Sequence, residues 1–332
     1  MTYSDSLFDR WIARPRRRWP GWLICLGMLL LPIVLSAAEI GLPAAVQQTG
    51  FRGLLIAPVV MTYIFVVSPF LTRTADQALA GLRPLVELDE PGYQALIGSP
   101  SSVRPRTEHW VILCGALLGA LQVLASNGGW PDSWQGWYWM LTTAGLYSLL
   151  GWAIFESIVG TRQIAAIHRA IRSVDPLDSQ PFEGIGRQSL LVSLVFIGGI
   201  SMSLLLVADQ PETLHRPEFW VVYASLAAIP VAIFFLNMRP THRLLSRAKR
   251  DELQRVSRQV NSSARRLAGL LEQGQPAGEL PGEITVLMAY ERRLESARTW
   301  PYDTSMLRTL GLSVLVPLAT VAIRSALERW LA

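Results

Sequence analysis

Long stretches without an ionisable side chain dominate this sequence. At a helical rise of about 1.5 Å per residue, about 20 apolar residues cross a hydrocarbon core of about 30 Å, whereas 10 to 14 usually form a buried helix of a soluble protein. Six runs of 20 to 23 residues meet this length, namely 19–38, 53–72, 109–131, 133–155, 188–208 and 219–238. The sequence therefore predicts an all-α integral membrane protein.

A shorter run near the C-terminus leaves the number of spans open. Residues 309–323 are 15 charge-free residues between Arg308 and Arg324. Because long arginine side chains can extend their guanidinium groups to the membrane surface, this segment either spans or lies in the interface, and we favour spanning. We expect six to seven transmembrane helices.

Basic residues predict the orientation of the spans. The segments on one face carry 25 arginine or lysine residues, and those on the other carry only Arg52 and Arg216. Basic loops stay in the cytoplasm. We therefore expect a multi-pass protein of a prokaryotic inner (cytoplasmic) membrane with a cytoplasmic N-terminus. Run 19–38 is long enough to be a retained signal anchor rather than a cleaved signal peptide.

Composition limits the partners and cofactors. Charged residues make up 17% of the chain, against about 25% in soluble domains. Both cysteines lie inside apolar runs, which excludes a disulfide scaffold or a cysteine zinc site. The net charge of +5 belongs to the cytoplasmic face, so we expect contact with the lipid bilayer and its anionic headgroups rather than with nucleic acid.

The chain is predicted to divide into three segments. Residues 1–240 form a six-span bundle with helical inner loops, and 301–332 form a C-terminal transmembrane or interfacial helix. Between them, apolar residues recur every three or four positions from Leu253 to Leu271, and two prolines and three glycines interrupt the pattern in 273–282. Residues 241–300 are therefore predicted to be a cytoplasmic antiparallel helical hairpin.

No motif indicates an enzyme. The phosphate-binding loop, the dinucleotide glycine motif, the kinase signatures and the HExxH zinc motif are all missing from the sequence. The four histidines lie outside the apolar runs and on both faces, so no two are expected to share a metal. We expect no catalytic residue, no cofactor and no metal.

Five residues are candidates for function or gating. Glu156 lies about one turn inside the cytoplasmic end of the fourth run, where a charge is costly; the alternative is an interfacial carboxylate paired with an arginine. Arg308 precedes the seventh run, and Asp303 is placed to cap the helix that contains it. Lys249 is the only lysine among 30 basic residues, in a segment that His242 begins; it either supplies a point charge or occurs by chance.

Small residues indicate where helices approach closely. Gly115 and Gly119 form a GxxxG pair in the third run, and Gly198 and Gly199 form a small patch in the fifth. Such positions serve packing within a bundle or contact between copies, so a homo-oligomer is a further expectation.

Several different short motifs lie on the predicted cytoplasmic face or at its boundary. They are Leu82-Arg83-Pro84-Leu85 with Leu88-Asp89, Val174-Asp175-Pro176-Leu177-Asp178, Pro240-Thr241-His242 through Lys249 to Glu252-Leu253, Trp300-Pro301-Tyr302-Asp303-Thr304, and the ending Leu307-Arg308, Pro317 and Glu328-Arg329. The set resembles a family of uncharacterised prokaryotic polytopic membrane proteins. The resemblance implies a multi-pass fold and no known activity. The chain departs from that family at Pro176-Leu177 and in its last span.

These observations favour a non-enzymatic function. The first hypothesis is an oligomeric channel or transporter-like protein for a small solute, with the hairpin as a cytoplasmic collar or gate. The alternative is a membrane-anchored docking or assembly module that binds a cytoplasmic partner through residues 243–298. A membrane enzyme is a distant third hypothesis.

Overall fold

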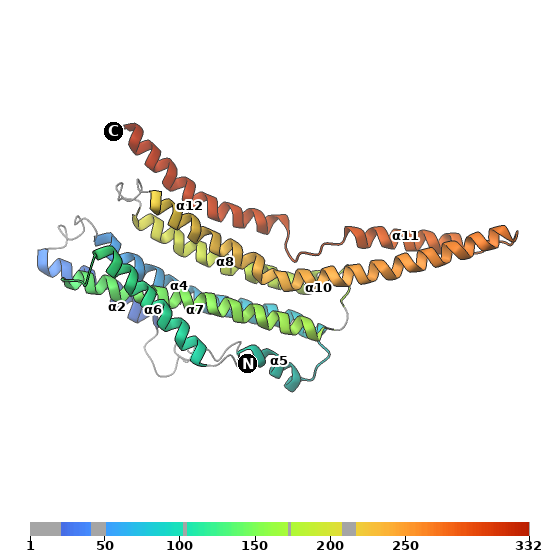
Figure 1. Ribbon diagram of the computed structural model, residues 1–332, viewed down its shortest axis with the longest axis horizontal. Helices are drawn as coiled ribbons and strands as arrows, with labels where there is room; N and C mark the ends of the chain where they lie inside the picture. Colours follow the sequence, from blue (N-terminus) through green and yellow to red (C-terminus); the bar gives the residue numbers. More distant parts are fainter. Residues whose placement is uncertain (1–20, 41–50, 102–104, 172–173, 208–216, 332) are drawn as a thin grey trace.

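The computed structural model describes residues 21–40, 51–101, 105–171, 174–207 and 217–331, and within them it contains helices and no strand. The helices are α2 (Gly21–Ile40), α4 (Phe51–Leu82), α5 (Glu90–Ser101), α6 (Pro105–Asn127), α7 (Trp134–Ala170), α8 (Gln180–Val207), α10 (Pro217–Glu272), α11 (Leu280–Ser296) and α12 (Thr304–Leu331), with a 3-10 turn η1 at Arg83–Leu85. The predicted all-helical fold is confirmed for these residues (Figure 1).

Five of the described helices are long and apolar enough to cross a membrane. Their segments are Gly53–Leu85, Thr107–Asn127, Trp134–Ala170, Gln180–Leu206 and Tyr223–Glu272. In α2 and α12 the apolar stretches are shorter, Leu26–Ala38 and Thr304–Ala319. A protein with several potential spans is thereby confirmed, whereas the count of six to seven stays a prediction. The N-terminal segment 1–20, expected in the cytoplasm, lies outside the described residues.

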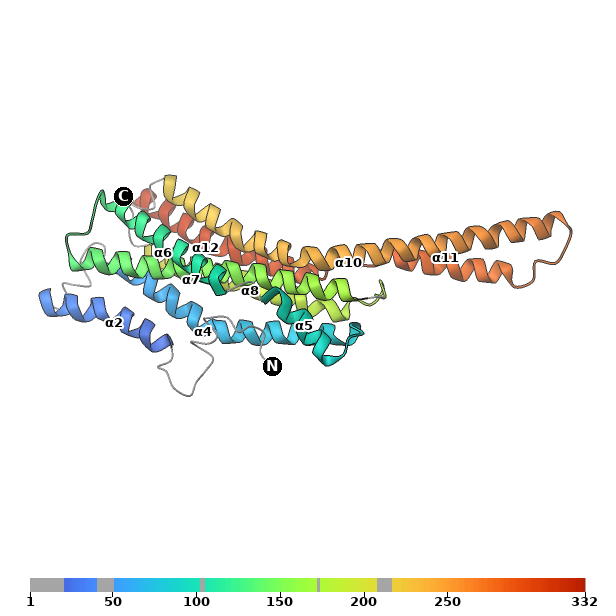
Figure 2. The same ribbon diagram turned by 60° about the horizontal axis from the view of Figure 1, so that its bottom comes forward.

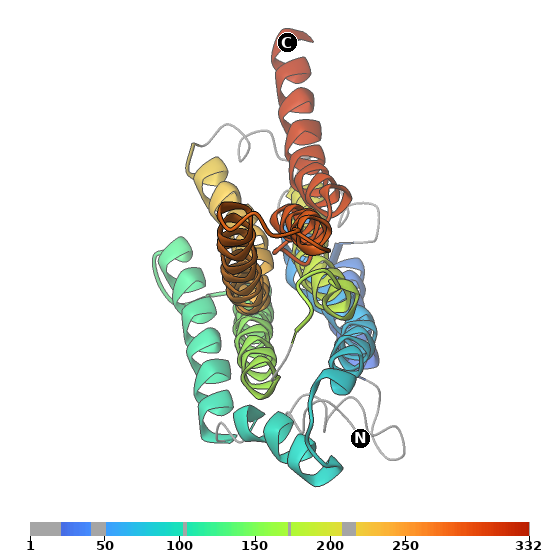
Figure 3. The same ribbon diagram turned by 90° about the vertical axis from the view of Figure 1, so that its right-hand side faces the viewer.

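Four of these helices close into a ring. α4 packs against α8, α8 against α10, α10 against α7, and α7 against α4, so that α7 and α8 stand diagonally opposite each other. The remaining apolar helices lie outside the ring, with α6 against α7, α2 against α4 and α12 against α8. Figure 3, which looks along the long axis, shows α6 and α12 at the periphery.

The two ends of this bundle carry different side chains, and we name them accordingly. The tryptophan end holds Trp130, Trp134 and Trp137 at the α6–α7 connection. The basic end holds exposed arginines of four helices, Arg73, Arg162, Arg187 and Arg239. α4, α7 and α10 run from the tryptophan end to the basic end, and α6, α8 and α12 run the opposite way.

Glycines allow α6 and α7 to approach closely. A Cβ atom added at Gly115 would lie 2.6 Å from the carbonyl oxygen of Tyr147, and one added at Gly119 would lie 2.8 Å from Cα of Ala144. Both neighbours are backbone atoms of α7. Gly198 similarly faces the Tyr63 side chain of α4. These glycines therefore pack helices of one and the same chain.

A separate apolar core lies at the basic end. It joins the ends of α4 and α7 to the beginnings of α5 and α8 and to α10, through Leu79, Leu82, Val86, Tyr93, Ile164, Ile167, Ile171, Phe182, Ile185 and Leu245. Ile164 and Ile167 of α7 are thus buried against neighbouring helices. α7 ends at Ala170, because Ile171 leaves the helix and forms a β-bridge with Val86.

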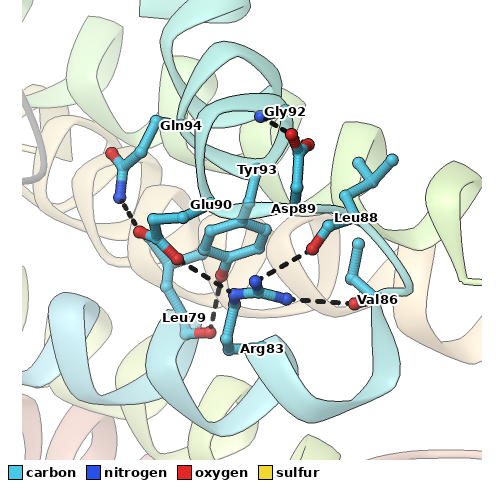
Figure 4. Close-up of polar contacts among 9 residues, drawn as sticks. All are labelled: Leu79, Arg83, Val86, Leu88, Asp89, Glu90, Gly92, Tyr93 and Gln94. Atoms are coloured by element: carbon cyan, nitrogen blue, oxygen red, sulfur yellow. Dashed lines mark hydrogen bonds and ion pairs between the residues drawn. The ribbon is translucent and has the colours of Figure 1, made fainter.

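Arg83 organises the connection between α4 and α5 (Figure 4). Its guanidinium donates hydrogen bonds to the carbonyl oxygens of Val86 (3.0 Å) and Leu88 (2.9 Å), and its Nε lies 3.5 Å from the Glu90 carboxylate. The same group lies over the ring of Tyr93, 4.7 Å from its centroid. One planar cation therefore fixes two carbonyls, an acid and an aromatic ring around the turn.

α10 is the longest helix and extends well beyond the bundle (Figures 1 and 2). Its 56 residues correspond to about 84 Å at the helical rise. It passes unbroken through Pro240, so the boundary expected between residues 240 and 241 falls inside a helix. α11 packs beside its far part, where Val256 of α10 and Leu294 of α11 are both buried.

The α6–α7 contact generates a first prediction. Gly119→Ala should lower the thermal unfolding midpoint in detergent, because overpacking a close contact costs about 1–3 kcal/mol. Gly311→Ala is the matched control, since a Cβ atom there meets nothing within 4 Å. Circular dichroism on heating measures both, and equal midpoints for the two variants would contradict this packing.

The Arg83 junction generates a second prediction. Arg83→Lys keeps the charge but loses the planar guanidinium fork that binds two carbonyls while it lies over the Tyr93 ring, and the loss of one such bond costs about 1.5 kcal/mol. Hydrogen exchange of the amides of residues 86–94 should therefore accelerate about tenfold. Arg187→Lys, at an exposed arginine 3.7 Å from Glu183, should leave exchange unchanged. Equal exchange in both variants would exclude the bridging role.

Candidate functional site

A cavity of about 550 Å³ lies inside the ring of α4, α7, α8 and α10. It reaches from Gly53 and Trp139 near the tryptophan end to Ala75 and Asn237 near the basic end. Helices of one chain therefore line a space that runs along most of the apolar bundle.

The walls of the cavity are apolar along its middle. The side chains there include Val60, Ile64, Leu146, Leu150, Val192, Val195, Phe196 and Ile229. Among the described residues that line the cavity, Glu156 is the only carboxylate, and there is no arginine, lysine or histidine. The cavity thus combines apolar walls with a single acid.

Polar side chains gather where the cavity approaches the basic end. The Thr161 hydroxyl of α7 donates a hydrogen bond to the side-chain oxygen of Asn237 on α10. The Gln188 side-chain amide of α8 donates one to the carbonyl oxygen of Leu71 on α4, at 3.4 Å. These two bonds join the helices of the ring in pairs at this end.

Gln188 also presents an acceptor that the protein does not use. Its Oε1 atom is buried and has no hydrogen-bond partner in the described part of the chain. A buried acceptor without a donor costs about 1–3 kcal/mol. Since Gln188 lines the cavity, a molecule in the cavity with a hydrogen-bond donor can remove this cost.

A second, open pocket of about 370 Å³ lies at the tryptophan end. Asn127, Trp130, Asp132 and Gln135 line it, together with Trp139. Trp139 also lines the ring cavity, so this residue forms part of the wall of both spaces.

The structure separates the candidate residues into two groups. Glu156 lines the cavity from α7, and Gly199 lines it from α8. His242, Lys249, Asp303 and Arg308 do not line it. They lie at the basic end, on α10, at the start of α12 and in the segment before it.

Lys249 and His242 connect α10 to the segment that follows α11. The Lys249 ammonium donates hydrogen bonds to the carbonyl oxygens of Glu295 (2.6 Å) and Ala297 (3.0 Å), which lie at the C-terminal end of α11. A cation is favourable there because the last carbonyls of a helix have no partner within it. The His242 ring stacks on Trp300, with centroids 3.9 Å apart and planes at 8°.

Asp303 begins α12. Its carboxylate accepts hydrogen bonds from the Met306 amide and the Ser305 hydroxyl, both at 2.8 Å. These bonds hold the pKa of Asp303 below its ordinary value. Arg308 is exposed one turn further along the helix. Both residues therefore belong to the entry of α12 and not to the cavity.

The sequence alone did not indicate the polar residues that share the cavity with Glu156. Gln188 is the first residue of the run 188–208 and Asn237 the last but one of 219–238, so an amide at the edge of an apolar run was the available signal. An amide at that position lies as readily at the membrane surface as in a cavity. Its placement follows from the packing of the four helices.

None of the family models, curated proteins or solved structures compared with the chain matches it.

The contact of Lys249 with α11 generates a third prediction. Lys249→Met keeps the apolar stem and removes the ammonium, so the amides of residues 294–300 should exchange hydrogen several-fold faster. Arg247→Met, a neutralisation of an exposed arginine two residues earlier on α10, is the control. Unchanged exchange in Lys249→Met would show that the lysine does not hold the end of α11.

Proposed function

We propose that the chain is a multi-pass membrane protein whose four-helix ring binds and moves a small, predominantly apolar solute. The observation that carries this proposal is the elongated cavity, which helices of a single chain line. Its volume of about 550 Å³ lies within the range of about 300–1,000 Å³ that small-molecule sites occupy. A solute of that size fits between α7 and α8.

The lining supports an apolar solute rather than a small hydrated ion. Pores that conduct ions replace the hydration shell with rings of carbonyl oxygens or charged side chains. The middle of this cavity offers valine, leucine, isoleucine and phenylalanine instead. Because an unsolvated ion in such surroundings is costly, a transporter-like role is favoured over an ion channel.

The proposed orientation places the basic end in the cytoplasm of a prokaryotic cell and Trp139 towards the outside. Arginines Arg73, Arg162, Arg187 and Arg239 then meet anionic headgroups of the inner leaflet. In this arrangement α2 and α12 complete six to seven spans. α10 and α11 form the cytoplasmic hairpin. Because α10 lines the cavity with its first part and forms one arm of the hairpin with its last part, the hairpin is suited to act as a collar or gate.

Self-association belongs to the same proposal. α6 exposes Leu117 and Leu121, and α12 exposes Leu315 and Val316. These apolar faces contact lipid or a second copy. Whether lipid or a second copy covers these faces does not change the proposed solute site, because residues of one chain line the cavity.

Exposed apolar residues favour docking of a cytoplasmic partner as the second candidate function. Leu271 of α10 and Val286 and Met288 of α11 are exposed beyond the bundle. A photocrosslinker at Val286 should then capture one defined partner in cells, and deletion of 243–298 should abolish the interaction while membrane insertion persists. Recovery of no defined crosslinked product would exclude this role.

Filling the cavity tests the solute-binding proposal. Val195→Phe on the cavity wall of α8 should weaken saturable binding of the apolar fluorophore N-phenylnaphthylamine at least tenfold in lipid nanodiscs. Leu205→Phe is the matched control, because Leu205 lies on the same helix and is exposed. Empty nanodiscs correct for partition into lipid. Equal affinity in the two variants would show that the probe does not occupy the cavity.

A further inference from the structure

A row of arginines follows one side of α10 beyond the bundle. Its members are exposed and form no ion pair with any residue that the structure describes; they are Arg243, Arg247, Arg250, Arg258 and Arg265. At about 100° per residue, these positions lie within about 80° of one another around the helix. The intervening positions on the same side, 254 and 261, hold glutamine and asparagine, so no carboxylate interrupts the row. We name these five residues the arginine row.

The arginine row lies on the side of α10 that faces away from α11. Val256 is buried at the contact with α11, and the Ser263 hydroxyl donates a hydrogen bond to the Glu283 carboxylate of α11 at 3.5 Å. These two residues of α10 lie about 180° around the helix from the row. The hairpin partner of α10 therefore leaves the arginine row uncovered.

The row is unfavourable for the helix that carries it. Arg247 follows Arg243 by four positions and precedes Arg250 by three, and like charges at these spacings destabilise a helix. Beside the row, Arg255 lies 2.9 Å from the Glu252 carboxylate. The chain thus pairs an arginine next to the row but leaves the row itself unpaired, so that an external anion can offset the repulsion.

The direction of α10 excludes a lipid surface as the partner of the whole row. The far part of α10 continues along the long axis of the bundle (Figures 1 and 2). The row extends for about 33 Å along the helix, whereas the headgroup layer on each side of a bilayer is only about 5–7 Å thick. Headgroups that surround the bundle reach the first arginine of the row and not the others.

The density of charge in the row fits an α-helix better than a nucleic acid. Five arginines over about 33 Å give one charge in about 7–8 Å. A helix with one carboxylate per turn carries one charge in about 5.4 Å, whereas duplex DNA carries one in about 1.7 Å. Arg250 follows Arg243 by seven positions, and Arg265 follows Arg258 by seven, which is the spacing at which two packed helices repeat their contacts.

The described helices of a second copy do not offer such a partner. α2, α4, α5, α6, α7, α8 and α12 each contain a single carboxylate side chain. α11 contains three, but Arg292 and Arg293 lie among them. α10 contains more basic than acidic residues. The complementary helix therefore belongs to a different protein.

We propose that the arginine row is a docking surface for an acidic helix of a cytoplasmic protein, a helix that presents about one carboxylate per turn along one side. This inference rests on the docking role that is the second candidate function, and it names the chemistry of the partner. Solute binding in the ring cavity is independent of it.

Two synthetic helical peptides of identical composition test the inference. Each has about 28 residues, the length of the row and about half a heptad at each end, and consists of glutamate, alanine and glutamine. One peptide places its glutamates along a single side, and the other distributes them around the helix. Fluorescence anisotropy measures their binding to the full-length protein in nanodiscs of zwitterionic lipid at an ionic strength of about 0.15 M, with empty nanodiscs as the blank. We expect the one-sided peptide to bind at least fivefold more tightly.

A triple variant assigns this preference to the arginine row. Arg250→Gln, Arg258→Gln and Arg265→Gln combined should weaken binding of the one-sided peptide about tenfold, because each exposed ion pair contributes about twofold. The variant should keep the unfolding midpoint of the unmodified protein or exceed it, since it removes like charges from one side of the helix.

A second triple variant removes the same charge away from the row. Arg266 lies on α10 outside the row, and Arg292 and Arg293 lie on α11; all three are exposed. Their combined replacement by glutamine should change the affinity for the one-sided peptide less than twofold. If both peptides bind equally well, or if the two triple variants weaken binding equally, only the net charge of the hairpin matters and the proposed surface is wrong.

A short DNA duplex and the crosslinker at Val286 complete the test. We expect the duplex to bind weakly and to lose equal affinity in both triple variants, so a loss confined to the row variant would make nucleic acid the partner and contradict the acidic helix. If the crosslinker captures a defined protein while neither peptide binds, the acidic helix is wrong although the hairpin docks. If the crosslinker captures nothing and neither peptide binds, the docking role itself is wrong.

Discussion

The closure of four apolar helices into a ring is the constraint on which the rest of the structure depends. Each helix satisfies its own backbone hydrogen bonds, which an apolar environment demands. Side-chain bonds between helices then fix their relative heights, through Thr161 with Asn237 and Ser193 with the Pro230 carbonyl. The helices contact one another around the ring, and a cavity lies between them. The proposed solute site is a consequence of this closure.

The basic end has a different role, which explains the motifs noticed in the sequence. Arg83 holds the α4–α5 connection, and the Asp175 carboxylate accepts a hydrogen bond from the Leu177 amide at 2.8 Å in the α7–α8 connection. Asp303 caps α12, and Lys249 holds the end of α11. These residues build helix connections and lie outside the cavity. α10 joins the two regions, since it lines the cavity and continues unbroken to Glu272.

The apolar segments and one residue of the site, Glu156, could be recognised from the sequence. The runs were recognisable by length, and Glu156 by the cost of a carboxylate within them. Gln188 and Asn237 were not recognised, because an amide at the end of an apolar run fits the membrane surface equally well. The boundary at residue 240 was placed where the apolar run ends. The helix continues past it because the following residues keep an amphipathic helical pattern.

The sequence by itself determined that the chain forms long apolar helices with a strongly basic set of connections, because length, periodicity and charge act locally along the chain. Only the tertiary structure decided which polar side chains meet. Thr161 and Asn237 are 76 positions apart, and their contact depends on how α7 and α10 are rotated and shifted against each other. That arrangement comes from the packing of all four helices together, and it brings a single acid and an unused acceptor into one cavity.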